Sequence, residues 1–137
     1  MKIVSFREFL VGCDANKEVS KSDLSKLEKY LDQVWGMLGV DVEFSRHFLD
    51  RINDTRNNRQ ITVCEVQKLF LDTYKKYGPA IKKMKNLEAV LTDLKTDVNV
   101  PFALKLDRRG DLELVAKTVM RKKSFVPNSK DEKHFKV

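Results

Sequence analysis

The hydrophobic residues of this chain change their spacing part-way along the sequence. Up to about residue 87 they recur every three or four positions, which is the period of an amphipathic helix. Over residues 100–106 they alternate, which is the period of a strand with one buried face. Helical periods followed by strand periods predict an α+β domain, in which N-terminal helices pack on a small C-terminal antiparallel sheet.

Two of the expected helices lie in the first forty residues. The first covers residues 4–11 and ends near Gly12. The second is capped by Ser22 and carries an apolar stripe from Leu24 to Leu38.

Two further helices follow. Ser45 is the expected N-cap of a short third helix. Thr62 and Glu65 form a capping box that opens a fourth, which is expected to end at Gly78 because Pro79 cannot continue it.

The sheet is expected mainly after residue 87. Residues 100–106 and 112–121 form a hairpin around a glycine-bearing turn, while residues 42–44 and 88–94 are ambiguous on pattern alone. Residues 1–121 therefore make one domain, and residues 122–137 are predicted to be a flexible, polar and basic tail.

Composition sets the class of partner. The chain has 137 residues and a net charge of +7, which favours a polyanion such as nucleic acid. No segment approaches the roughly twenty apolar residues that span a bilayer, and we expect the first residues not to be a signal peptide because Arg7 and Glu8 interrupt their apolar run. Cys13 and Cys64 lie far apart without metal spacing, so we expect no disulfide scaffold, a reducing cytoplasmic location and no metal or cofactor.

The first candidate for chemistry is a histidine followed by an arginine one helical turn later. His47 and Arg51 would project from the same helix face, with His47 as a general base or acid and Arg51 as a phosphate ligand. The alternative is structural: Arg51 pairs with Asp54 or Glu65, and His47 only caps the helix.

The second candidate is a cationic surface. Lys117 and Arg121 share one face of the expected last strand, near Lys105 of its partner, and such a row suits a nucleic-acid backbone. Other cations are clustered without defined geometry at Arg56, Arg59, Lys122 and Lys123. The alternative is an ordinary solvated face of a sheet.

The segment from His47 through Arg51 to the helix opening at Thr62 and Glu65 resembles the RegB family of phage mRNA endoribonucleases. It also resembles the wider superfamily of small RelE/barnase-like nucleases, with the likeness extending over residues 43–121. The resemblance implies helices followed by strands at residues 88–94, 100–106 and 112–121, an RNA-cradling sheet and metal-independent cleavage. The chain departs from the RegB pattern because no second histidine lies between His47 and the tail.

Three functions follow as hypotheses. The first is a metal-independent endoribonuclease, or a toxin-like relative, that uses His47. The second is a non-catalytic phage protein that binds nucleic acid, RNA in first place, or a host protein through the basic hairpin. The third is a phage structural or assembly factor whose basic surface is incidental. If the chain is phage-encoded, the expected location is the host cytoplasm. Oligomeric state is left open by the sequence.

Overall fold

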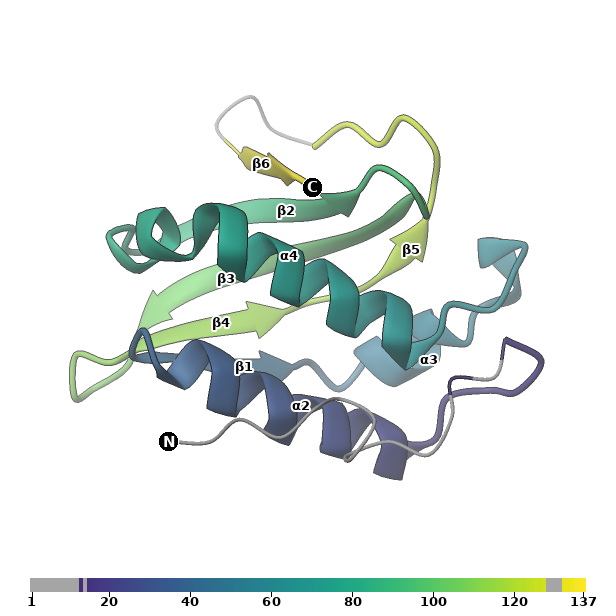
Figure 1. The fold of residues 1–137 in the computed structure, drawn as a ribbon, viewed down its shortest axis with the longest axis horizontal. Helices are drawn as coiled ribbons and strands as arrows, with labels where there is room; N and C mark the ends of the chain where they lie inside the picture. The colour runs from purple at the N-terminus through teal and green to yellow at the C-terminus, as the bar shows by residue number, and fades with distance from the viewer. Residues whose placement is uncertain (1–12, 14, 128–131) are drawn as a thin grey trace.

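The protein folds as a helical layer on one face of a mixed β-sheet (Figure 1). The computed structural model describes residue 13 and residues 15–127 and 132–137, so the helix expected at residues 4–11 lies outside the described residues. The elements are α2 (Lys21–Gly36), β1 (Val40–Phe44), α3 (Phe48–Ile52), η1 (Thr55–Asn57), α4 (Val63–Lys82), β2 (Leu87–Asp93), β3 (Val98–Leu106), β4 (Leu112–Ala116), β5 (Met120–Arg121) and β6 (Lys133–Lys136). The predicted α+β class is confirmed.

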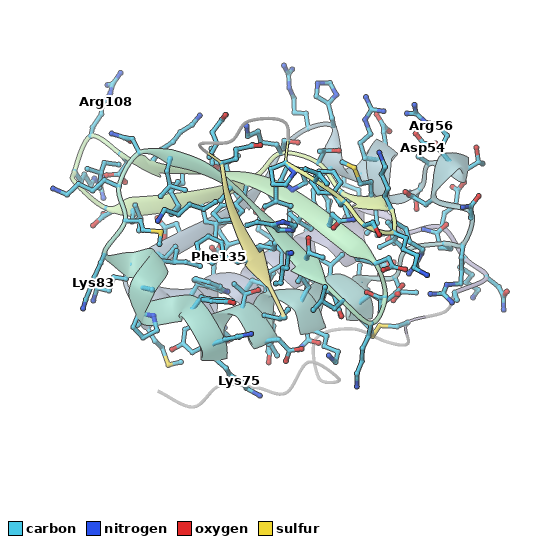
Figure 2. The ribbon with its side chains drawn as sticks, turned by 90° about the horizontal axis from the view of Figure 1, so that it is seen from above. Asp54, Arg56, Lys75, Lys83, Arg108 and Phe135 are labelled. Carbon is cyan, nitrogen blue, oxygen red and sulfur yellow. A yellow bond between two sulfur atoms is a disulfide. The ribbon has the colours of Figure 1, made fainter. Side chains whose placement is uncertain are left out.

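The core lies between the sheet and helices α2 and α4. Trp35, Phe70 and Phe102 are fully buried there, one from each helix and one from the central strand. Charged side chains surround this core: Lys83 and Arg108 project at one end of the molecule and Arg56 at the other (Figure 2). Within the described part of the chain, no helix combines the length and apolar character needed to cross a membrane.

The sequence predicts an antiparallel sheet, but the observed sheet is mixed. Its strand order is β1-β4-β3-β2-β6, with β5 paired to β3. β3 pairs antiparallel with β2, β4 and β5, but β1 lies parallel to β4 and β6 lies parallel to β2. Long stretches of chain separate the members of each parallel pair, so no hairpin forces them to run in opposite directions.

The tail contains the edge strand β6, which corrects the prediction that the domain ends at residue 121. Residues 133–136 pair with β2, and Phe135 is only 6% exposed. Its ring lies 5.1 Å from that of Tyr77 on α4 and 6.2 Å from that of Phe102 on β3. One buried aromatic residue therefore anchors a segment whose neighbours are mostly charged.

Helix starts depend on reciprocal side-chain contacts. Thr62 and Glu65 form the predicted capping box at the start of α4. At α2 the cap is Ser20 and not Ser22, because Ser20 and Asp23 exchange hydrogen bonds in the same way. Asp23 thus has the role at α2 that Glu65 has at α4, three residues after the N-cap. The sequence-based assignment to Ser22 looked for a glutamate at this position and therefore missed the capping box.

Two other predicted helix limits are wrong. Ser45 does not cap α3, which begins after His47; the hydroxyl of Ser45 instead donates to the carbonyl of Lys117 at 2.6 Å. Pro79 does not end α4, which continues to Lys82. Pro79 is exposed while Ile81 is fully buried, so packing of the last turn compensates for the missing proline N–H.

A one-residue bulge divides the strand predicted at residues 112–121. Ala116 lies opposite Phe102 and Met120 lies opposite Asn99, so residues 117–119 face residues 100–101 of β3. The extra residue reverses the alternation of faces, and Val119, expected to point outward, is 2% exposed. Lys117 and Arg121 therefore do not share the outer face.

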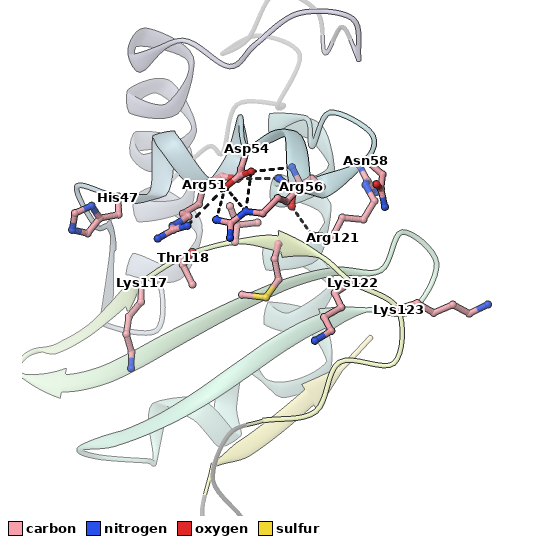
Figure 3. A pocket seen from close by; sticks show the side chains of 13 residues that line it. His47, Arg51, Asp54, Arg56, Asn58, Lys117, Thr118, Arg121, Lys122 and Lys123 are labelled. Atoms are coloured by element: carbon pink, nitrogen blue, oxygen red, sulfur yellow. Dashed lines mark hydrogen bonds and ion pairs between the residues drawn. The ribbon is translucent and has the colours of Figure 1, made fainter.

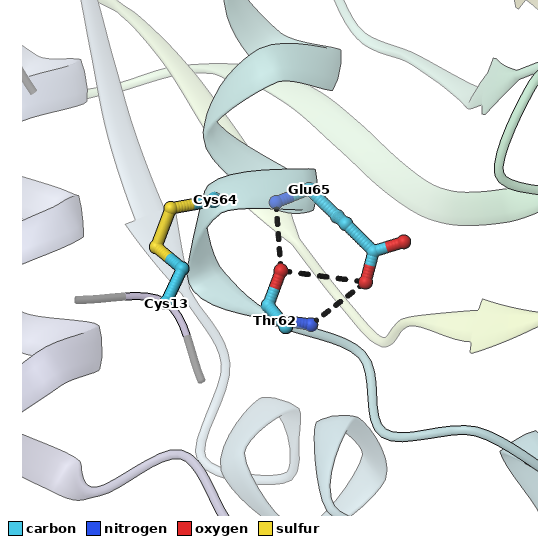
Figure 4. The surroundings of a disulfide bond; sticks show 4 residues. All are labelled: Cys13, Thr62, Cys64 and Glu65. Carbon is cyan, nitrogen blue, oxygen red and sulfur yellow. Dashed lines mark hydrogen bonds between the residues drawn. A yellow bond between two sulfur atoms is a disulfide. The ribbon is translucent and has the colours of Figure 1, made fainter. Parts of the chain in front are cut away.

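The two cysteines form a disulfide, against the sequence-based expectation. Cys13 and Cys64 are 51 residues apart in sequence and their Cα atoms are 5.7 Å apart (Figure 4). Cys64 is the second residue of α4, beside the Thr62–Glu65 capping box. The predicted cytoplasmic location rested partly on unpaired cysteines, and the disulfide removes that support.

We expect loss of the disulfide to lower the free energy of unfolding by about 2–4 kcal/mol, because the bond closes a long loop in the unfolded chain. Denaturant unfolding of the Cys13→Ser/Cys64→Ser variant would measure this loss. Dithiothreitol should destabilise the unmodified protein by a similar amount and leave the double variant unchanged. An equal effect of the reductant on both proteins would contradict a structural disulfide.

Candidate functional site

A cavity of about 880 Å³ lies between α3–η1 and the bulged segment 117–123 (Figure 3). It brings together seven of the nine residues predicted as functional from the sequence: His47, Arg51, Arg56, Lys117, Arg121, Lys122 and Lys123. Arg59 and Lys105 do not line it. The clustering arises from the fold, since the two walls are some seventy positions apart in sequence.

Hydrogen bonds from two polar side chains join the walls of the cavity. Ser45 binds the carbonyl of Lys117, as described above. Asn57 is 4% exposed, donates to the carbonyl of Arg51 at 2.9 Å and accepts the N–H of Arg121 at 3.0 Å. Neither residue was singled out as a wall-to-wall link from the sequence, because an asparagine or serine in a polar loop carries no local sign of such a distant partner.

Asp54 holds two arginines at one wall. Its carboxylate accepts hydrogen bonds from Nη2 of Arg56 at 2.8 Å and from Nε at 3.1 Å, while Nη1 of Arg51 lies 3.8 Å away. The hydrogen bonds from the Arg56 side chain and backbone lower the pKa of Asp54 to about 2. Arg51 thus pairs with Asp54, as the structural alternative predicted. Because two guanidinium groups share this one carboxylate, some of their N–H donors stay free for a ligand.

The guanidinium of Arg121 is bound by protein groups on all sides. Its side chain is 10% exposed and donates to both carboxylate oxygens of Glu65 at 2.9 Å, with further bonds to the carbonyls of Thr96 and Gln60. Burial alone would raise the pKa of Glu65, but the hydrogen bonds from Arg121 and from the N–H of Thr62 outweigh it and hold the pKa below its ordinary value. The Nε of Arg121 also donates to the carbonyl of Arg59 at 3.4 Å, so all five N–H donors of the guanidinium are engaged and none remains for a ligand.

The remaining predicted cations differ in how far they are neutralised. Lys117 forms an ion pair with Glu88 across β3, which lowers the pKa of that carboxyl. Lys105 is exposed opposite Glu113 in the β3–β4 register. Lys122 and Lys123 are exposed, and neither ammonium has an ion-pair partner among the residues that the structure describes.

His47 lies at one end of the cavity with its ring exposed (Figure 3). It occupies the N-cap position of α3, but its side chain makes no capping hydrogen bond. The second histidine, His134, lies in β6 outside the cavity lining, with Nε2 2.7 Å from the hydroxyl of Thr92. Burial, followed by the charge of Lys136, lowers the pKa of His134. The cavity thus offers one imidazole and no second histidine.

No protein-family profile, curated protein or solved structure matches this chain. The likeness to RegB-type and RelE/barnase-like nucleases stays a prediction. Among the described residues, no group of three or more histidine, cysteine or acidic side chains is placed to hold a metal ion.

We predict that Arg121→Met lowers the free energy of unfolding by about 3 kcal/mol, because it leaves Glu65 partly buried without its charge partner. The exposed pair Lys68–Asp72 provides the control, and Lys68→Met should lower the same quantity by only about 0.4 kcal/mol. Denaturant unfolding at neutral pH measures both.

The pH dependence gives a second readout for this pair. Because the pKa of Glu65 is lowered on folding, its stabilising effect is present above the ordinary glutamate pKa of about 4.3 and disappears as the pH falls through the lowered value. The stability difference between the unmodified protein and Arg121→Met should therefore shrink in acid. A difference that stays constant with pH would contradict the assignment.

Proposed function

We propose that this protein binds the phosphodiester backbone of a nucleic acid, RNA in first place, along the cavity between α3–η1 and residues 117–123. The observation that carries the proposal is the charge of this cavity. Six cationic side chains line it, and three carboxylates, those of Asp54, Glu65 and Glu88, pair with them, so three positive charges remain uncompensated. Neutralising phosphates there would release counterions and favour binding.

The composition of the lining supports recognition of the backbone over recognition of bases. The described residues that line the cavity include no phenylalanine, tyrosine or tryptophan, so this lining offers no stacking platform for single-stranded bases. Arg51, Lys122 and Lys123 supply donors that suit phosphate oxygens. We therefore expect weak sequence preference.

The test is charge reversal at the uncompensated lysines. Lys122→Glu/Lys123→Glu should weaken binding of a labelled RNA by roughly tenfold or more, and should reduce the slope of log affinity against log salt by about 1.5. Fluorescence anisotropy over a salt series, with RNA and DNA of the same sequence, measures both quantities.

The matched control is Lys82→Glu/Lys83→Glu, which changes net charge equally at the other end of the molecule. Figure 2 shows Lys83 far from Arg56, which marks the cavity end. This control should retain most of the affinity. Equal losses in the two variants would show that net charge alone attracts the RNA and would refute a defined site.

Cleavage of RNA is a second candidate, favoured by the presence of His47 and Lys117 in the lining of one cavity. His47 would remove the proton of a ribose 2′-hydroxyl, whose oxygen would attack the adjacent phosphorus to form a 2′,3′-cyclic phosphate. The bond from phosphorus to the 5′-oxygen would break, and the released 5′-oxygen would take a proton from water. Lys117 would stabilise the charge that develops on the phosphate oxygens.

For this reaction we expect cleavage of mixed RNA in EDTA to be lost in His47→Ala and kept in His134→Ala, because His134 does not line the cavity. Gel electrophoresis of the RNA products measures the rate. Intact RNA with the unmodified protein would remove the nuclease hypothesis and leave the binding proposal to the anisotropy experiment.

A further inference from the structure

The outer edge of β1 is closed by side chains. β1 is an edge strand, paired on one side with β4. On the other side its N–H groups at Val42 and Phe44 donate to Oδ1 of Asp32 at 2.7 Å and to Oε2 of Glu28 at 3.0 Å. These carboxylate oxygens occupy the positions that the carbonyl oxygens of a neighbouring strand would take.

Both carboxylates come from one face of α2, since Glu28 and Asp32 are four residues apart. Burial raises the pKa of Asp32 in spite of the hydrogen bond from Val42, and the charges of Glu28 and Asp41 raise it further. The two side chains are therefore held at the edge against mutual repulsion and loss of hydration. The edge is thus closed by two side chains of α2, whereas the other side of β1 is held by its backbone pairing with β4.

The solvent-facing row of β1 is acidic, although the chain as a whole carries a charge of +7. Asp41 and Glu43 are exposed, and Asp41 lies directly opposite Glu113 of β4. A hydrogen bond shared with Glu43, together with burial, raises the pKa of Glu113. The carboxylates of Asp41, Glu43 and Glu113 therefore repel one another. A strand added beside β1, with cations at alternate positions, would reduce this repulsion.

A groove of about 400 Å³ continues from the end of β1 toward α2 and α3. Leu24, Phe44 and Leu49 provide its apolar surface, and Lys21, Ser25, Glu28, Ser45 and Arg46 provide its polar surface. Side chains on one face of an added strand would point to this groove, and those on the other face would point to the acidic row.

We infer that β1 is a strand-addition site for an extended, positively charged peptide segment. Carbonyl oxygens of the peptide replace the carboxylates at the N–H groups of Val42 and Phe44, and its alternate lysines or arginines face Asp41 and Glu43. A second copy of β1 fits this edge poorly, because antiparallel pairing about Val42 sets Asp41 of one copy opposite Glu43 of the other.

The probe is a blocked peptide of alternating lysine and valine, titrated at low salt into the isotope-labelled full chain. The amide signals of Val42 and Phe44 should shift, and their exchange with solvent should slow. Asp41→Asn/Glu43→Gln should weaken binding by roughly three- to tenfold. The control Glu18→Gln/Asp50→Asn removes two exposed charges elsewhere and should leave affinity unchanged.

Two further peptides separate strand addition from general attraction. Replacing the lysines by glutamates should abolish binding, and replacing the central valine by proline should abolish it too, because proline removes a backbone donor and disfavours pairing. Equal binding of the proline peptide, unchanged affinity in Asp41→Asn/Glu43→Gln, or a dimer of the unmodified chain that shields Val42 and Phe44 would each overturn the inference.

Discussion

The guanidinium of Arg121 joins the end of the sheet to the start of the longest helix. It satisfies Glu65, which in turn caps α4, and it binds the carbonyls of Gln60 and Thr96 from the flanking loops. A buried cation of this kind is unfavourable to leave unpaired, so its partners constrain where β5 can lie. The path of residues 117–123, and with it one wall of the cavity, depends on this contact.

The bulge before β5 turns the side chain of Arg121 toward Glu65 and so makes this contact possible. Without an extra residue, Lys117 and Arg121 would point to the same side of the sheet. With it, Lys117 reaches Glu88 on the open face and Arg121 reaches Glu65 on the helical face. The net charge of the chain does not distinguish these neutralised cations from Arg51, Lys122 and Lys123, on which the binding proposal mainly rests.

Features with local signals were predictable from the sequence. The capping box at Thr62 and the hairpin around residues 107–111 lie where their patterns place them, because contacts between near neighbours determine them. The bulge, the Cys13–Cys64 disulfide and strand β6 were not predictable. Each depends on residues distant in sequence, and β6 has only Phe135 as an inward anchor among charged neighbours. Site residues were found by charge, but among their partners only Asp54, three residues after Arg51, was anticipated. The pairing of Arg121 with Glu65 and that of Lys117 with Glu88 were not.

The carboxylates near these cations would also limit the path of a polyanion bound as proposed. Along the open face of β4 the charge changes sign, from Lys117 beside the cavity to Glu113, which lies between Asp41 and Lys105 in the sheet. The predicted cationic stripe from Arg121 to Lys105 is therefore interrupted by carboxylates. A phosphate backbone that leaves the cavity along β4 would meet repulsion from Glu113 and Asp41. It would instead follow Lys122 and Lys123, away from β1, so the basic and acidic surfaces can serve different partners on the same sheet.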